Sequence, residues 1–135
     1  MSTAGERDLA QLLKHLSPTL AAKPFRIVAA LNPTPGELDS AFMICREAEG
    51  TTLIYADESA DADDAECYAR ITLQVHSSLA AVGLTAAVSA ALMRESIPAN
   101  VVAGFYHDHV FVPWAVRDRA LETLKSLSDQ SAVSF

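Results

Sequence analysis

Three histidines and an aspartate stand near the ends of predicted strands in the second half of the chain. His76 closes the segment RITLQVH. His107, Asp108 and His109 follow one another between GFY and VFVP. Imidazole and carboxylate groups are ligands of zinc and other transition metals, and they also hold polar small molecules. These side chains therefore define a candidate site for a metal ion or a small ligand.

Gly83 and two serines add a second kind of binding group. Gly83 opens a helical segment, and Ser77 and Ser78 lie in the loop before it. Backbone N–H groups at a helix N-terminus attract carboxylates, although a glycine there also suits a tight helix entry. The two hydroxyls are expected to cap the helix or to bond a ligand.

A catalytic interpretation of Ser77 has less support. A serine nucleophile needs a positioned base and an oxyanion hole. Adjacent residues at a strand end point in different directions, so His76 does not serve Ser77 easily, and the chain has no GxSxG motif. We expect a protein without enzymatic activity, and a histidine-based or metal-dependent enzyme at this site is the alternative.

The order of elements after residue 70 determines which of these residues meet. Residues 70–76 alternate as a strand, and residues 83–97 carry apolar groups at helical spacing. Residues 99–106 and 109–113 predict a hairpin, and a further helical pattern follows it. This order is the split βαβ unit of the ferredoxin-like fold. In that topology the end of the first strand lies beside the start of the third, so the candidate residues gather at one end of the sheet.

The hairpin register assigns faces to the side chains around the turn. With His107 and Asp108 in the turn, Phe105 pairs with Val110 and Tyr106 pairs with His109. Phe105 would then face the helices. His-Asp is not a preferred two-residue hairpin loop, and a slip of one residue would exchange the faces.

The first half of the chain predicts a helix and three strands. The helix covers residues 7–16, and two strands cover residues 24–31 and 41–47. Residues 48–56 predict a turn at Gly50 and then the third strand. Residues 32–40 are rich in turn formers and predict a loop. The three strands are expected to form an antiparallel meander. At the other end of the chain, residues 131–135 are either a last strand or a tail.

Composition excludes several classes of function. The chain has 135 residues and a net charge of −7, without a basic cluster, which argues against nucleic-acid binding. It has no apolar run of membrane length and no signal-like N-terminus. Cys45 and Cys67 are too few for a disulfide framework. No nucleotide-binding motif is present, so we expect no cofactor. Because no membrane-length run and no signal-like N-terminus are found, we expect a cytoplasmic protein.

The segments VGLTAAVSAAL and IPANVVAGFYHDHVFVP resemble the ACT-domain family. The chain is similar to small stand-alone bacterial proteins that pair two ACT-like units, and to the ACT domains of the cytosolic arginine sensor of animals. The shared pattern is Gly83-Leu84, Phe105, Asp108-His109 and Val112-Pro113. It is good over about residues 70–128 and weaker over residues 24–56.

The resemblance implies an α+β, ferredoxin-like (ACT-like) antiparallel sheet with helices on one face. It implies two ACT-like units: residues 1–66 would form an incomplete one, with the N-terminal helix and the meander. Residues 67–135 would form the second. The family implies homodimerisation through a sheet edge or a helix face.

The resemblance also implies a regulatory module that binds a small molecule, in particular an amino acid. Gly83 and Leu84 would offer backbone groups, Gly104 and Phe105 would lie beside the ligand, and Asp108 would face a cationic group. The full candidate set is His76, Ser77, Ser78, Val82, Gly83, Leu84, Gly104, Phe105, Tyr106, His107 and Asp108. A metal site at His76, His107, His109 and Asp108, and a purely structural dimerisation module, are the alternatives.

Overall fold

One antiparallel sheet organises the molecule, whose computed structural model describes residues 5–60 and 65–133. The strand order is β3–β4–β2–β5–β7–β6, and β1 pairs with β5 as well. The strands are β1 (Pro18–Leu20), β2 (Phe25–Ala30), β3 (Met43–Glu47), β4 (Gly50–Ala56), β5 (Tyr68–Leu73), β6 (Asn100–Ala103) and β7 (Asp108–Pro113). The helices are α1 (Leu9–Lys14), α2 (Pro35–Ser40), α3 (Leu84–Arg94), the short 3₁₀ helix η1 (Trp114–Val116) and α4 (Arg117–Val133).

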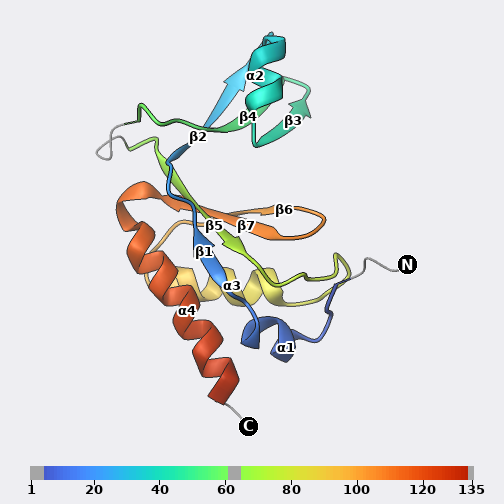
Figure 1. The fold of residues 1–135 in the computed structure, drawn as a ribbon, viewed down its shortest axis with the longest axis vertical. Coiled ribbons are helices and arrows are strands. Elements are labelled where there is room, and N and C mark those ends of the chain that lie inside the picture. The colour runs from blue at the N-terminus through green and yellow to red at the C-terminus, as the bar shows by residue number, and fades with distance from the viewer. Residues whose placement is uncertain (1–4, 61–64, 134–135) are drawn as a thin grey trace.

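The second half follows the predicted order β5–α3–β6–β7–α4. Helices α1, α3 and α4 lie on one face of its strands (Figure 1). The strand alternation buries Ile71 and Leu73 of β5 beneath these helices, together with Val110 and Val112 of β7. The apolar stripe of α3 and the inner face of α4 complete this core. The expected α+β ferredoxin-like fold, with an antiparallel sheet and helices on one face, is confirmed.

A strand from the N-terminus completes the sheet of the second half. Leu20 of β1 lies opposite Ile71 of β5, and α1 packs against α3 and α4. The alternative of a last strand over residues 131–135 is wrong, because α4 continues through Val133. Residues 134–135 lie outside the described part. The division at residues 66 and 67 therefore does not coincide with the strand pairing, since α1 and β1 join the later strands.

The first half is not the predicted meander. The chain runs β2–α2–β3–β4, and β4 lies between β3 and β2. A helix begins within the predicted loop of residues 32–40. The Thr34 hydroxyl accepts from the Glu37 N–H, the Glu37 carboxylate accepts from the Thr34 N–H, and Pro35 occupies the first turn. This short helix carries the chain past β2, so that β3 occupies the outer edge (Figure 1).

Aromatic rings join the two halves on the sheet face opposite the helices. Phe42, which precedes β3, stacks edge-on against Phe25 and Phe111 at centroid distances of 5.9 and 6.0 Å. The Arg70 guanidinium lies 4.9 Å from the ring centroid of Phe25 and 4.7 Å from that of Phe42. This aromatic contact fixes β2 and the start of β3 against β5 and β7, in addition to the backbone pair Phe25–Tyr68 between β2 and β5.

Candidate functional site

A cavity of about 210 Å³ opens at the N-terminus of α3. The loop after β5, the first turn of α3 and the facing ends of β6 and β7 form its wall. Five of the predicted residues line it, and five others complete the lining. The lining residues are Ser77, Ser78, Leu79, Ala81, Gly83, Leu84, Thr85, Ala86, Ala103 and Asp108.

Gly83 gives the cavity an uncapped helix N-terminus. Gly83 has a φ of 103°, a left-handed conformation that glycine adopts without steric cost. No side chain among the described residues caps this end of α3, and the Ala87 N–H donates to the Gly83 carbonyl as the helix begins. The N–H groups of Leu84, Thr85 and Ala86, which precede the first intrahelical hydrogen bond, therefore remain available to an anionic ligand. Val82 is exposed and stands outside the cavity lining.

The Asp108 carboxylate receives little hydrogen bonding that could offset the burial of its negative charge. Asp108 begins β7 and is partly buried. The Ser77 hydroxyl donates to its Oδ2 at 3.5 Å, at the outer limit of hydrogen bonding. Burial raises the pKa of Asp108, and the Ser77 bond offsets this only in part. A cationic group in the cavity would favour the ionised form.

His109 lies on the other face of the sheet. Its Nδ1 is 2.9 Å from the Thr72 hydroxyl, and its ring packs edge-on against Phe42 at 4.9 Å. Burial lowers the pKa of His109, as do, to a smaller extent, the charges of Arg70 and His107. Because adjacent strand residues face opposite sides, His109 and Asp108 do not share one site.

The alternative metal set of His76, His107, His109 and Asp108 is therefore not assembled. Across residues 5–60 and 65–133, no group of three or more His, Cys, Asp and Glu side chains is placed to hold a metal ion.

The hairpin register differs from the predicted one by four residues. Ala103 pairs with Asp108, and the Gly104 N–H donates to the His107 carbonyl at 2.9 Å to close the turn. Phe105 and Tyr106 thus belong to the turn, where both are exposed. The expected pairs Phe105–Val110 and Tyr106–His109 are wrong, and Phe105 does not face the helices.

An exposed aromatic group forms beside this turn. β5 ends at Leu73, so His76 does not close the strand as predicted. Its ring lies 5.7 Å from the ring of Tyr106, which lies 5.0 Å from the ring of Phe105. Five predicted residues are close in sequence to residues that line the cavity but do not line it themselves: His76, Gly104, Phe105, Tyr106 and His107.

Sequence reasoning missed half of the lining. Thr85 and Ala86 lie in the first turn of the helix after Gly83, so the N–H groups expected to bind a ligand at this helix N-terminus include theirs. Ala103 enters because the turn is longer than expected. Leu79 and Ala81 lie in an irregular loop, where periodicity gives no signal.

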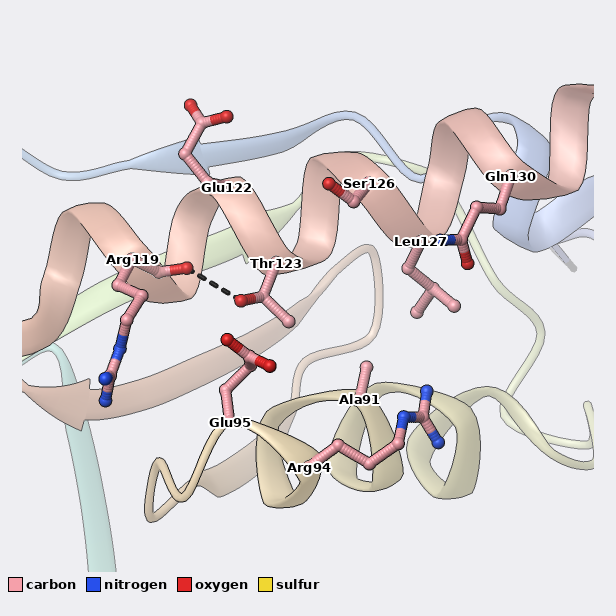
Figure 2. A pocket seen from close by; sticks show the side chains of 9 residues that line it. All are labelled: Ala91, Arg94, Glu95, Arg119, Glu122, Thr123, Ser126, Leu127 and Gln130. Carbon is pink, nitrogen blue, oxygen red and sulfur yellow. Dashed lines mark hydrogen bonds between the residues drawn. The ribbon is translucent and has the colours of Figure 1, made fainter.

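A larger cavity of about 370 Å³ lies between α3 and α4 (Figure 2). Glu95 points toward α4, whereas Glu122 extends away from α3. These two carboxylates, together with Arg94 and Arg119, are exposed and therefore solvated. None of the predicted site residues lines this space. The smaller cavity has the stronger chemical case, because its carboxylate is partly desolvated.

Among the residues that the structure describes, none forms a helix with the length and apolar character needed to cross a bilayer.

Comparison with known proteins relates both halves of the chain to one family. Models of the ACT domain match residues 4–69 and residues 68–126. A protein of unknown function from Vibrio cholerae, a possible transport protein, is 35% identical, with a TM-score of 0.72. The similarity covers 89% of this chain and 95% of that one. No curated protein matches the sequence.

Two more distant structures share the fold. The ligand-free regulatory subunit of aspartate kinase from Thermus thermophilus is 10% identical, with a TM-score of 0.60, over 84% of this chain and 97% of that chain. Aspartokinase III of E. coli in complex with aspartate and ADP is 14% identical, with a TM-score of 0.60, over 94% of this chain and 34% of that chain. The two matched ranges, which together span residues 4–126, show that this chain belongs to the ACT-domain family.

Proposed function

We propose that the chain is a regulatory module that binds a small amino acid in the cavity at the N-terminus of α3 and catalyses no reaction. One observation carries the proposal: Asp108 and the first turn of α3 line the same cavity. A carboxylate and a set of free N–H groups, facing one space, are complementary to the two charges of a zwitterion.

The chemistry assigns an orientation to the ligand. The ammonium group would lie at Asp108, where it stabilises the ionised carboxylate against burial. The ligand carboxylate would lie at the N–H groups of Thr85 and Ala86, at the positive end of the α3 dipole. Ser78, at the rim of the same space, would bond the ligand from the side.

The cavity volume suits a single amino acid. At about 210 Å³ it is smaller than the roughly 300–1,000 Å³ typical of sites for drug-sized ligands. The aspartokinase regulatory subunit shares this fold, and that likeness supports a regulatory role. A catalytic role lacks a comparable arrangement of nucleophile and base, since Ser77 contacts Asp108 rather than an imidazole.

Oligomeric state, location, cofactors and other partners complete the proposal. The protein would act as a homodimer in the cytoplasm, without a cofactor and without nucleic-acid or membrane partners. The division into units of residues 1–66 and 67–135 stays a prediction, since β1 pairs across it with β5.

A thermal-shift screen of the twenty amino acids at millimolar concentration tests the function. The ligand should raise the melting temperature, because it binds the native state alone. Asp108→Asn should abolish the shift, and the exposed Asp129→Asn should retain it. No shift with any amino acid would overturn the proposal in favour of a module that only joins chains.

A further inference from the structure

The N-terminal segment of residues 5–9 runs along the loop that forms the cavity wall. The Glu6 N–H donates to the His76 carbonyl at 2.8 Å, and the Ser78 N–H donates to the Glu6 carbonyl at 2.8 Å. Glu6 and Ser77 thereby form an isolated parallel β-bridge. The loop of residues 76–82 has no strand of its own, so this bridge supplies regular backbone pairing to it.

Gly5 allows this close approach. A Cβ atom at Gly5 would overlap the His76 carbonyl and would lie 2.6 Å from the carbonyl carbon of Ser77. These atoms are backbone and cannot turn aside as a flexible side chain can. Any side chain at position 5 must therefore push the segment away from the loop.

The segment is stiffened at its other end. The Glu6 carboxylate accepts from the N–H groups of Arg7 and Asp8 at 2.8 and 2.9 Å, and the Asp8 side chain accepts from Ala10 at the start of α1. Leu9 of α1 then contacts the Gly83 position, where a Cβ atom would lie 3.0 Å from Leu9 Cδ2. The segment thus contacts the cavity loop at both ends, at His76–Ser78 and at Gly83.

The bridged residue is the one that contacts the candidate carboxylate. Ser77 is 8% exposed, and its hydroxyl donates to Asp108 Oδ2. Glu6 bonds the backbone of His76 and Ser78, on either side of Ser77, and the Ser77 side chain contacts Asp108. A shift of the segment therefore displaces the hydrogen-bond donor of Asp108.

We propose that residues 5–9 form an N-terminal strap that positions the ligand-binding loop, with Gly5 and Glu6 as positioning residues that act on Asp108 through Ser77. The inference rests on the proposed function for its effect on affinity, but the ordering of the loop does not depend on it. The strap sets the affinity for the ligand's cationic group, which meets Asp108. It has little effect on the affinity for the ligand's anionic group, which lies at the helix N-terminus.

Two variants of the full-length protein test the strap. Gly5→Ala introduces the overlapping Cβ atom, and its control, Gly36→Ala, places a Cβ atom no nearer than 3.9 Å to the Thr34 hydroxyl. Glu6→Pro removes the N–H that bonds His76, and its control, Glu6→Ala, loses the same side chain but keeps that N–H. The second pair decides the question if Gly5→Ala does not fold.

Hydrogen exchange gives the first readout. In both strap variants, peptides that cover residues 76–83 should exchange about fivefold faster, the effect of losing one typical backbone hydrogen bond. Exchange in β4 should stay unchanged. Wild-type exchange rates over residues 76–83 in both strap variants would overturn the inference.

Ligand selectivity gives the second readout. For the amino acid that stabilises the wild-type protein most, the dissociation constant should rise about tenfold in the strap variants, as for a weakened charged hydrogen bond. The dissociation constant of the matching carboxylic acid that lacks the amino group should rise less than about twofold, because this compound makes no contact with Asp108. Equal losses for both compounds would overturn the positioning role. If no amino acid binds the wild-type protein, the proposed function fails, and hydrogen exchange alone decides the strap.

Discussion

Asp108 and His109 are neighbours in β7, yet they face opposite sides of the sheet. Asp108 faces the cavity beside α3, and His109 contacts Thr72 and Phe42 on the other side. One strand therefore carries the candidate ligand contact on its helix-covered face and the contact with the first half on its other face. A shift of β7 on ligand binding would therefore move both the candidate ligand contact and the contact with the first half.

The stability of Asp108→Asn should show the cost of the candidate site. Because burial raises the pKa of Asp108, the folded protein favours its protonated form, and the ionised form destabilises the fold at neutral pH. The variant should melt at the same temperature as the wild type or higher at pH 7. The difference should shrink as the pH falls through the raised pKa. Thermal unfolding between pH 7 and pH 3.5 measures this, with Asp129→Asn as the control, and a variant less stable at every pH would show Asp108 to be structural.

His109 should make stability fall in mildly acidic solution. Its pKa is lowered in the folded protein, so the unfolded chain binds a proton first. The stabilising contribution is complete above the unfolded value of about 6.5 and is lost as the pH falls through the lower folded value. Urea unfolding at pH 7.5 and pH 5 should show a smaller loss in His109→Gln than in the wild type. The exposed His15→Gln should behave like the wild type, and an unchanged loss in His109→Gln would assign the effect to other groups.

Gly83→Ala should destabilise the protein by about 1–3 kcal/mol, the cost of a left-handed conformation in a residue with a side chain. The φ of 103° and the Leu9 side chain 3.0 Å from the added Cβ atom both oppose alanine. Gly36→Ala, in an open position of α2, is the matched control and should leave stability unchanged or raise it by up to about 1 kcal/mol. Chemical denaturation provides the comparison, and equal stability of both variants would contradict the structure at this turn.

Phe42→Ala should weaken the contact between the two halves. Its ring meets Phe25, Phe111 and His109, so its loss should cost about 2 kcal/mol, somewhat less than for a fully buried phenylalanine. Phe105→Ala removes an exposed ring and should cost less than about 0.5 kcal/mol. Urea unfolding of the two variants distinguishes them, and a neutral Phe42→Ala would show that the ring contact contributes little.

The sequence predicted the second half well where burial dictates a period. Ile71 and Leu73 alternate in β5, and Leu84, Val88 and Leu92 repeat at helical spacing in α3, because one face of each element is buried. Local patterns of this kind hold the information for element type and for which side faces the core.

The errors arose where distant residues or ambiguous turn formers decide the structure. The stretch Thr34-Pro35-Gly36-Glu37 contains turn formers, but its capping box was a readable signal for α2. β1 has only three residues and is a strand because it pairs with β5, so no local sequence pattern predicts it. The longer turn at Gly104–His107 displaced the predicted register, and with it the placement of Phe105.

The pairing of β1 with β5 has a consequence for the order of folding. Thr19 and its partner Thr72 are 53 positions apart. During synthesis, β1 therefore leaves the ribosome well before the strand that it must join, while β2, α2, β3 and β4 emerge in between. The central sheet closes late, after this long loop has been made, and until then the nascent chain carries a strand edge whose backbone N–H and C=O groups are unpaired.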